Sequence, residues 1–260
     1  MRAIVTGGTR GIGAGIAKAF VASGATVVIC GREEAAGQAA AHAIAAAGEG
    51  TCQFVACDVR SSQDNERLVA TALEHLGGLD CLVNNAGWHP PHRPIDDIAV
   101  AELVELLRLN VVSYFEVTKL ALPAIRDARG CVINVGSLVG GIGQVHASDY
   151  VISKAAIAGL TRALAIDEAR HGVRVNTVVP GVVETPSHLA YLEAQDDPGS
   201  AAAEVNRWQW LARIGRPEEV GHLCCFLASQ GAAFITGATI PVSGGAELGY
   251  GAKAGWVSTG

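Results

Sequence analysis

Short apolar runs rich in valine and isoleucine alternate along the whole chain with longer stretches rich in alanine and leucine. Short runs that are apolar at successive positions are typical of strands buried on both faces of a parallel sheet. The expected strands are Ala3–Thr6, Thr26–Cys30, Cys52–Cys57, Leu79–Asn84, Cys131–Val135, Val173–Val179 and Thr239–Val242. The expected helices are Ile12–Ser23, Glu33–Ala47, Gln63–Leu76, two segments within Ile98–Asp127 interrupted near Asn110, Tyr150–His171 and Pro217–Ala228.

This alternation predicts an α/β protein with a Rossmann-like, doubly wound parallel sheet of about seven strands and helices on both faces. No linker or shift in composition divides the chain, so we expect residues 1–260 to form a single domain. Pro186–Leu211 departs from the alternation because Asp196–Ser200 breaks it. We expect residues 186–211 to form an irregular, partly helical flap over the substrate.

Composition excludes several classes of function. Of the 260 residues, 50% are apolar and 17% are charged, and the net charge is −6 with no run of lysines and arginines. We therefore expect no nucleic-acid partner. No apolar run reaches the ~20 residues that a membrane-spanning helix needs, and the first strand leaves no room for a signal peptide. The seven cysteines form no C-x-x-C pair, which favours a reducing, cytoplasmic location.

A glycine-rich loop lies between the first expected strand and the first expected helix. A dinucleotide needs a tight turn there, a close approach of the backbone to its pyrophosphate, and free N–H groups at a helix N-terminus. Turns also favour glycine, but this position at the first strand–helix junction favours nucleotide binding. The loop residues expected to contact the cofactor are Gly7, Thr9, Arg10, Gly11, Ile12 and Gly13.

The end of the second expected strand bears on the choice of cofactor. Enzymes that select NAD place a carboxylate there, which accepts hydrogen bonds from the ribose 2′-hydroxyl. Here Gly31 occupies that position and Arg32 follows it. A guanidinium attracts a 2′-phosphate, and Arg10 supplies a second positive charge. We therefore favour NADP(H) over NAD(H); the alternative is that Arg32 is only a surface residue.

Ser137, Tyr150 and Lys154 form the candidate catalytic set. Tyr150 and Lys154 are four residues apart on an expected helix, so both project from one face. Ser137 follows the fifth expected strand, at the edge where open α/β sheets bind ligands. A free tyrosine has a pKa near ~10, which an ammonium and an oxidised nicotinamide would lower. The set predicts hydride transfer in which Tyr150 exchanges the proton and Ser137 holds the substrate oxygen.

These motifs together resemble those of the short-chain dehydrogenase/reductase family, and the resemblance runs through the whole chain. The residues that carry it are Thr6–Gly13, Asp58, Asn84–Gly87, Asn110, Ser137, Tyr150, Lys154 and Pro180–Thr185. The resemblance implies a homotetramer, or alternatively a dimer, and a water held by Asn110 in a proton relay to Lys154. The further cofactor contacts that it implies are Asp58, Val59, Asn85, Ala86, Gly87, Tyr150, Lys154, Pro180, Gly181, Val183 and Thr185.

Within that family, the chain particularly resembles hydroxysteroid dehydrogenases. The segments that carry this likeness are Asn84–Pro91, Ser137–Gln144 and Gly244–Gly251. The likeness implies a steroid-like, polyketide-like or sugar substrate. The residues that would border it are His89, Ser137, Gln144, Tyr150 and Tyr250. Those relatives use NAD and carry an aspartate where Gly31 stands, so the chain departs from them at the cofactor.

The expected function is therefore an NAD(P)(H)-dependent oxidoreductase that interconverts a secondary alcohol and a ketone on a small molecule. One alternative is a 3-oxoacyl thioester reductase, which would receive an acidic acyl carrier on Arg207, Arg213 and Arg216. Another is a non-catalytic regulator that senses dinucleotides with the same fold. His89 and His92 lie in a loop without a cysteine or carboxylate cluster, so we predict no metal site.

Overall fold

A single parallel sheet of seven strands forms the centre of the computed structural model, which describes residues 1–249. The strands are β1 Arg2–Val5, β2 Thr26–Gly31, β3 Thr51–Ala56, β4 Cys81–Asn84, β5 Cys131–Val135, β6 Arg174–Pro180 and β7 Thr239–Val242. They follow the order β3-β2-β1-β4-β5-β6-β7. The order reverses between β1 and β4, and open α/β sheets bind ligands beyond the carboxyl ends of the strands at such a point.

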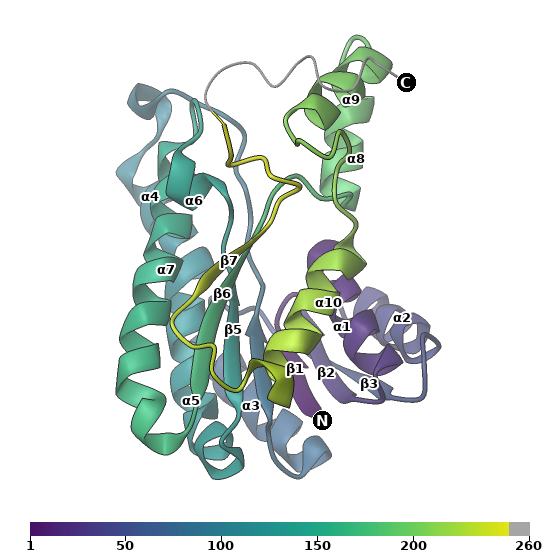
Figure 1. Ribbon diagram of the computed structural model, residues 1–260, viewed down its shortest axis with the longest axis vertical. Coiled ribbons are helices and arrows are strands. Elements are labelled where there is room, and N and C mark those ends of the chain that lie inside the picture. The colour runs from purple at the N-terminus through teal and green to yellow at the C-terminus, as the bar shows by residue number, and fades with distance from the viewer. Residues whose placement is uncertain (250–260) are drawn as a thin grey trace.

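Helices cover both faces of this sheet (Figure 1). The helices of the described residues are α1 Gly11–Ala22, α2 Glu34–Ala45, α3 Ser62–Leu76, α4 Val100–Leu107, α5 Ser113–Ala128, α6 Val139–Ile142, α7 Ser148–Glu168, α8 Pro186–Glu193, α9 Pro198–Arg207 and α10 Pro217–Ala228, of which α8 and α9 lie away from the sheet. Helices α1, α2 and α10 pack on one face, and α3, α5 and α7 pack on the other. The predicted Rossmann-like sheet is confirmed.

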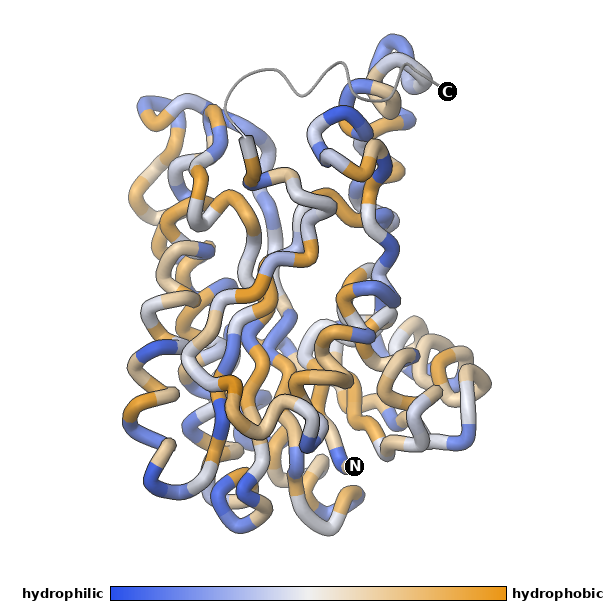
Figure 2. The backbone as a smooth tube through the Cα atoms, in the orientation of Figure 1, coloured by the Kyte–Doolittle hydropathy of each residue, from blue (hydrophilic) through white to orange (hydrophobic). Residues whose placement is uncertain are grey.

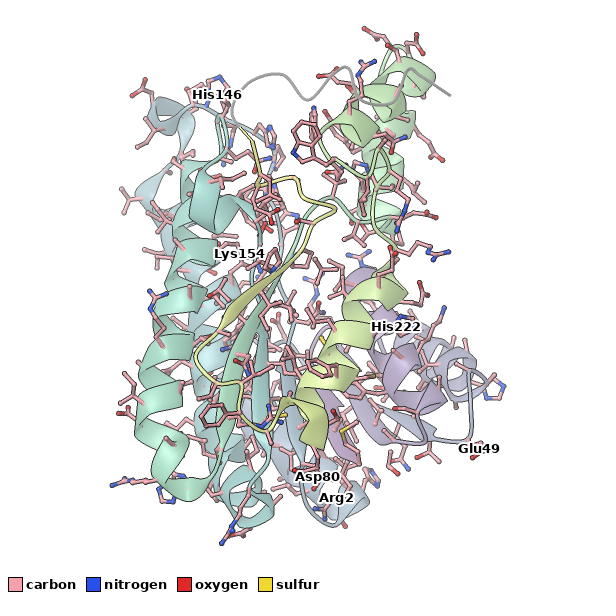
Figure 3. All side chains as sticks on the ribbon, in the orientation of Figure 1. Arg2, Glu49, Asp80, His146, Lys154 and His222 are labelled. Carbon is pink, nitrogen blue, oxygen red and sulfur yellow. The ribbon has the colours of Figure 1, made fainter. Side chains whose placement is uncertain are left out.

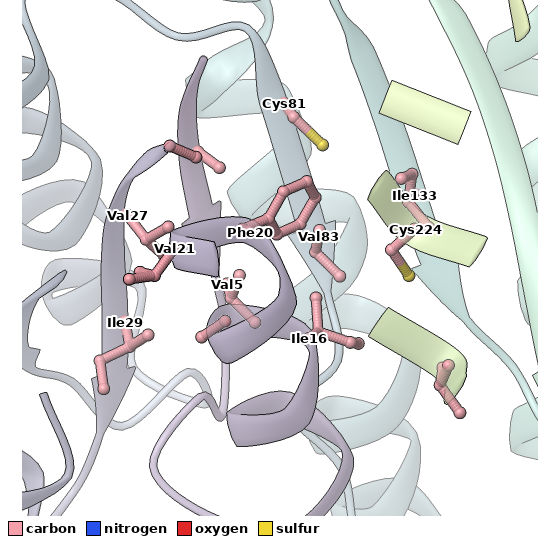
Figure 4. Packing of buried hydrophobic residues seen from close by; sticks show 14 of the residues in the cluster. Val5, Ile16, Phe20, Val21, Val27, Ile29, Cys81, Val83, Ile133 and Cys224 are labelled. Atoms are coloured by element: carbon pink, nitrogen blue, oxygen red, sulfur yellow. The ribbon is translucent and has the colours of Figure 1, made fainter. Parts of the chain in front are cut away.

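Alternate strand residues enter two separate cores. Val5 and Val83 face the core formed with α1, α2 and α10, whereas Ile4 between Ala3 and Val5 faces the opposite core. Figure 4 shows Ile16 and Phe20 of α1 over these strand side chains. Figure 2 shows apolar positions concentrated along the strands. Burial on both faces explains why the strands are apolar at successive positions instead of alternating.

Several local features refine or correct the expected elements. The interruption near Asn110 is a π-helical turn, Arg108–Val112, between α4 and α5. The flap contains α8 and α9, and Asp197 caps α9 by accepting the N–H of Ser200 at 3.0 Å. We did not predict α6, because Gly140 and Gly141 disfavour a helix.

Several expected boundaries differ from the structure by a few residues. The strand expected from Leu79 begins only at Cys81, and the helix expected to reach His171 ends at Glu168 before a short 3₁₀ turn. These are small errors, because helix ends commonly tighten into such turns. Within residues 1–249, no helix is both long enough and apolar enough to cross a membrane.

Candidate active site

The glycine-rich loop between β1 and α1 depends on the absence of side chains. Gly7 and Gly11 have φ angles of 62° and 55°, in the left-handed region that favours glycine. A Cβ atom on Gly13 would lie 2.2 Å from the carbonyl oxygen of Gly7 and 2.4 Å from Asn85 Nδ2. Asn85 Nδ2 donates to the carbonyl oxygens of Thr6, at 2.9 Å, and Gly7, at 3.1 Å. The loop is thus packed backbone against backbone at the end of β4.

The first turn of α1 is suited to an anion. It contains no acidic residue, and no side chain caps it. Arg10 precedes the helix in an extended conformation and is exposed, whereas Ile12 packs against the core. The N–H groups of a first helical turn have no intrahelical partners and carry a partial positive charge. The loop and this turn together therefore fit a pyrophosphate.

Thr9 occupies the space beside Gly31 at the end of β2. A Cβ atom on Gly31 would lie 2.9 Å from Thr9 Cγ2 and 3.2 Å from Thr9 Oγ1. An aspartate at this position would therefore require the Thr9 side chain to rotate. Arg32 follows Gly31 and is exposed. The end of β2 thus presents a cation and not a carboxylate.

Asp58, the residue expected at the adenine, already has a partner within the chain. Arg60 Nε donates to its two oxygens at 3.0 and 3.1 Å, and Arg60 Nη2 donates to Oδ2 at 2.5 Å. The Arg60 hydrogen bonds lower the pKa of the Asp58 carboxyl, and the charge of Arg32 adds to this effect. Val59 follows with its side chain buried. An adenine amino group would therefore share the carboxylate with Arg60, a residue absent from our predicted site.

Ser137, Tyr150 and Lys154 meet at the carboxyl end of β5. The Ser137 hydroxyl lies close enough to the Tyr150 phenol to lower its pKa. Lys154 lies one turn further along α7, and its Nζ donates to the carbonyl oxygen of Val135 at 3.0 Å. The Lys154 Nζ lies 5.9 Å from the centroid of the Tyr150 ring. Figure 3 shows Lys154 near the middle of the molecule, beside the central strands.

Burial shifts the pKa values of Tyr150 and Lys154 towards their neutral forms. It raises the pKa of Tyr150 to about 12, although the nearby Ser137 hydroxyl acts in the opposite direction. It lowers the pKa of Lys154 to about 8. We expected the Lys154 ammonium to lower the pKa of Tyr150. In the chain without its cofactor, desolvation outweighs any such effect, and the pKa of Tyr150 is raised instead. A phenolate at this site needs further positive charge.

Asn110 is fully buried in the π-helical turn. Its Nδ2 donates to the carbonyl oxygen of Trp88 and to Ser153 Oγ, both at 3.0 Å, and its Oδ1 accepts the Trp88 N–H at 3.0 Å. A Cβ atom on Gly87 would lie 3.1 Å from Asn110 Oδ1 and 3.6 Å from Lys154 Nζ. Asn110 therefore joins the loop at Trp88 to α7, two contacts that no motif in the sequence indicated.

The loop after β4 places His89 against Tyr150. The centroids of their rings are 4.0 Å apart, and the planes are inclined by 41°. His89 Nε2 lies 3.0 Å from Gln144 Oε1, and Gln144 Nε2 lies 3.2 Å from His92 Nε2. The structure thus brings the predicted substrate residues His89 and Gln144 together beside Tyr150. It adds His92, which the sequence analysis named only in arguing against a metal site.

The segment Pro180–Thr185 connects the glycine-rich loop to the flap. Val183 is buried. The Thr185 methyl group lies 3.3 Å from the position that a Cβ atom on Gly11 would take. The Thr185 hydroxyl caps α8 by accepting the N–H of His188 at 3.2 Å. One residue therefore contacts the loop through its methyl group and the flap through its hydroxyl.

Ala86 and Tyr250 are the remaining predicted site residues. The Ala86 N–H donates to Thr6 Oγ1 at 3.1 Å, so it belongs to the contact between β1 and the loop after β4. Tyr250 lies outside the described residues. Among residues 1–249, no three histidine, cysteine, aspartate or glutamate side chains gather where they could hold a metal ion.

Known proteins are similar in sequence to this chain over nearly its whole length. The family model described as Enoyl-(Acyl carrier protein) reductase matches residues 7–247. L-fucose dehydrogenase of Bos taurus is 48% identical over 252 residues, which are 97% of this chain and 91% of that protein. Cis-4-hydroxycyclohexanecarboxylate dehydrogenase of Sinomonas cyclohexanicum is 36% identical over 244 residues, 94% of this chain and 95% of that protein.

Solved structures agree with these likenesses. The Pseudomonas aeruginosa RhlG/NADP active-site complex is 33% identical, with a TM-score of 0.87 over 95% of this chain and 96% of that chain. The likeness therefore extends from the sequence to the arrangement of the whole sheet and its helices. The chain belongs to the short-chain dehydrogenase/reductase family, whose members use nicotinamide dinucleotides, and it is an oxidoreductase that acts on CH–OH groups.

Proposed function

We propose that this chain is an NADP(H)-dependent dehydrogenase that interconverts a secondary alcohol and a ketone on a small, polar, cyclic molecule. The observation that carries the proposal is the meeting of Ser137, Tyr150 and Lys154 at the end of β5. This group lies on the same edge of the sheet as the glycine-rich loop. A proton-exchanging phenol and a dinucleotide-binding loop are the two parts that hydride transfer to or from a carbinol requires.

The fit of the dinucleotide is supported by the backbone around Gly7 and Gly13, where a Cβ atom would collide with neighbouring atoms. The loop and the first turn of α1 would hold the pyrophosphate, and Asp58 with Val59 would hold the adenine. The residues proposed for the nicotinamide end are Asn85, Ala86, Gly87, Tyr150, Lys154, Pro180, Gly181, Val183 and Thr185. The bound nicotinamide supplies or accepts the hydride.

The chain's own residues would move the proton. In alcohol oxidation, Ser137 would hold the substrate oxygen while the Tyr150 phenolate takes the hydroxyl proton. Lys154 would favour this phenolate while it is charged, and burial places the Lys154 pKa at about 8. Asn110 would hold the loop at Trp88 against α7 through its hydrogen bonds to Trp88 and Ser153. We also propose that Asn110 positions a water towards Lys154.

The preference for NADP(H) is argued from charge and space at the end of β2. Arg32 and Arg10 are exposed cations suited to a 2′-phosphate. Thr9 occupies the space beside Gly31, where NAD-selective enzymes carry a carboxylate. The similar RhlG structure from Pseudomonas aeruginosa is a complex of that protein with NADP.

The proposed substrate class comes from the side chains around Tyr150. His89 and Gln144 offer hydrogen bonds beside the phenol, which suits a molecule with several hydroxyl groups. The names of the relatives describe a sugar and a hydroxylated cyclohexane as substrates of those proteins. Leu189, Tyr191, Trp208 and Trp210 of the flap, and Tyr250, would complete the site. A steroid-like or polyketide-like alcohol is the second substrate class.

The 3-oxoacyl thioester reductase remains an alternative, because the matching family model is named for an acyl-carrier substrate. It would need a basic surface for the carrier. Arg213 of the candidate patch is already paired with Glu219, with Nη2 2.6 Å from Oε1. This ion pair reduces the positive charge available to an acidic carrier, which favours a small-molecule substrate that is not bound to a carrier protein.

We further propose that residues 1–260 form one domain with a flap at 186–211, that the chain assembles as a homotetramer, and that it acts in the cytoplasm. Exposed apolar side chains on α4, α5 and α7, among them Val104, Phe115 and Ile166, support assembly. The seven cysteines are all free, which suits a reducing compartment.

The test is a panel of alcohols with each cofactor. Purified protein with NADP⁺ or NAD⁺ is mixed with sugars such as L-fucose, hydroxylated cyclohexanes, steroid alcohols and, in the reverse direction, 3-oxoacyl thioesters, and nicotinamide absorbance is followed. We expect turnover of a polar cyclic alcohol, and a higher kcat/KM with NADP⁺ than with NAD⁺. Turnover of thioesters alone would favour the alternative, and a preference for NAD⁺ would contradict the cofactor assignment.

A further inference from the structure

Polar side chains form a buried row across three neighbouring strands of the sheet. Asn84 of β4 is in register with Asn134 of β5, and Asn134 is in register with Thr177 of β6. Asn84 Nδ2 donates to Asn134 Oδ1 at 2.9 Å, and all three side chains are buried. We call these residues, together with Thr118 and Thr161 of the adjoining helices, the buried polar layer.

Two helices contact the buried polar layer through threonine hydroxyls. On α5, Thr118 Oγ1 accepts a hydrogen bond from Asn84 Nδ2 at 2.9 Å. On α7, Thr161 Oγ1 accepts from Asn134 Nδ2 at 2.8 Å and lies 2.7 Å from Thr177 Oγ1. Thr161 therefore joins α7 to β5 and β6, and Thr118 joins α5 to β4.

Stability alone does not explain why these positions are polar. Asn84 Oδ1 is buried without a hydrogen-bond partner among residues 1–249. A buried polar atom without a partner destabilises a fold, whereas apolar side chains of the same shape can replace a buried polar pair with little loss. Hydrogen bonds are directional and apolar contacts are not, so a polar layer fixes the height of one element against another.

Thr161 lies on the helix that carries the proton-transfer residues. The buried face of α7 includes Lys154 and Thr161, which are about 10 Å apart along the helix axis. Ile157 lies between them and is apolar, so its contacts are not directional. Lys154 Nζ donates to the carbonyl oxygen of Val135, the residue that follows Asn134 on β5. Two successive residues of β5 therefore hold α7 at two heights.

Two further polar contacts of α7 link it to other helical segments and not to the sheet. Glu168 is paired with Arg126 of α5, with Arg126 Nη2 2.6 Å from Glu168 Oε1. Asn110 of the π-helical turn donates to Ser153 Oγ at 3.0 Å. These contacts leave the height of α7 relative to β5 to the lysine and to Thr161.

We propose that Thr161 is a positioning residue for proton transfer, because its hydroxyl fixes the height of α7 against β5 and β6. Tyr150 and Lys154 move with α7, whereas Ser137 follows β5. A shift of α7 along β5 would separate the phenol and the ammonium from the Ser137 hydroxyl. The catalytic consequence rests on the proposed function, whereas the placement of Lys154 against Val135 does not.

The direct test compares crystal structures of the wild-type chain and of Thr161→Val, which keeps the shape of the side chain but lacks its hydroxyl. We expect Lys154 Nζ to move beyond hydrogen-bond reach of the Val135 carbonyl oxygen, to more than about 3.5 Å. Thr161→Ser keeps the hydroxyl and should retain the wild-type distance. Thr118→Val is the matched control, because it removes a buried hydroxyl of the same layer from a helix without Tyr150 or Lys154.

The catalytic readout separates kcat from KM at saturating cofactor. Thr161→Val should lower kcat for alcohol oxidation about tenfold and change KM less than about twofold, since misplaced groups impair the transfer more than the binding. Thr161→Ser should keep kcat within about twofold of the wild type. Thr118→Val should lower the midpoint of thermal unfolding as much as Thr161→Val does, by about 5 °C, while kcat stays within about twofold.

Thr177→Val takes the place of Thr161→Val if the latter does not fold. It removes one contact of the Thr161 hydroxyl and leaves the hydrogen bond from Asn134. We therefore expect the same direction of change, with kcat lowered about threefold.

An unchanged distance between Lys154 and Val135 in the folded variant would overturn the proposal. An equal fall of kcat in Thr118→Val would also overturn it, because loss of stability would then explain both variants. A displaced Lys154 with unchanged kcat would overturn the catalytic consequence. Lack of turnover by the wild type with every alcohol would count against the proposed function, and the comparison of structures would stand apart from it.

Discussion

The cofactor side of the site consists mainly of backbone atoms, whereas the substrate side consists of side chains from separate loops. Around Gly7 and Gly13, backbone atoms pack so closely that a single added carbon would lie 2.2 Å from a carbonyl oxygen. Around His89 and Gln144, side chains from separate loops meet through hydrogen bonds that water can replace. The cofactor side therefore tolerates almost no substitution at these glycines. The substrate side can be altered residue by residue, which suits a surface that selects substrates.

The largest effect is expected at Lys154, which lies where the two sides meet. Lys154→Met should lower kcat about 1000-fold, since it removes the cation beside Tyr150. The same change should raise the thermal stability of the cofactor-free protein at pH 7. Burial lowers the Lys154 pKa from 10.5 to about 8, so the wild type binds fewer protons than its unfolded state between these values and gains stability as pH rises.

The advantage of Lys154→Met in thermal unfolding should therefore shrink from pH 8 to pH 10.5. Unfolding curves at pH 7, 9 and 10.5 measure this trend. A variant that is less stable than the wild type at pH 7 would show that the hydrogen bond to Val135 matters more than the desolvation of the ammonium.

The cofactor side is tested by Gly13→Ala. A methyl group there would collide with backbone atoms of the glycine-rich loop, so cofactor affinity should fall about 100-fold or more. Fluorescence titration with NADPH measures the affinity. Gly159→Ala on α7 is the matched control, because within residues 1–249 the added Cβ would meet no atom within 4 Å beyond its chain neighbours and its own helix backbone, and affinity should stay unchanged. Equal affinities of the two variants would contradict the described loop.

A smaller effect is expected at the end of β2. Gly31→Asp should lower the ratio of kcat/KM for NADP⁺ to that for NAD⁺ by about tenfold, because a carboxylate repels the 2′-phosphate. Gly31→Asp combined with Thr9→Gly should lower the ratio further, since Thr9 no longer occupies the space of the new side chain. A rise in the ratio would place the 2′-phosphate away from Arg32.

The smallest effect is expected on the substrate side. Leu189→Ala removes an exposed apolar side chain of α8 and should raise KM for the alcohol about threefold with little change in kcat. His222→Ala on α10, which also alters an exposed side chain, is the control and should leave KM unchanged. An unchanged KM for Leu189→Ala would place this part of the flap outside the substrate site.

The difference between the two sides also explains what the sequence could predict. Strands, helices and the glycine-rich loop can be recognised from local sequence patterns, such as apolar runs and closely spaced glycines. Most of their boundaries were predicted within a few residues. The break near Asn110 was predicted, but its π-helical form was not. The contact of Asn110 with Trp88 joins residues 22 apart in sequence, and no local pattern indicates it.

The pKa of Tyr150 illustrates a second limit of sequence reasoning. The spacing of Tyr150 and Lys154 correctly placed them on one helix, but the sequence does not give the depth of burial. Desolvation raises the pKa of Tyr150 to about 12, opposite to the direction expected from its charged neighbour. The contacts of His89 and His92 with Gln144 likewise arise only when two loops meet, and no local pattern indicates them.

Turnover and cofactor binding by Tyr150→Phe, measured on the same preparation, test the central claim most directly. The variant keeps the ring that packs against His89 but lacks the phenol oxygen. We expect kcat for alcohol oxidation to fall about 1000-fold or more while the dissociation constant for NADPH changes less than about threefold. Turnover within about tenfold of the wild type would contradict proton exchange by Tyr150.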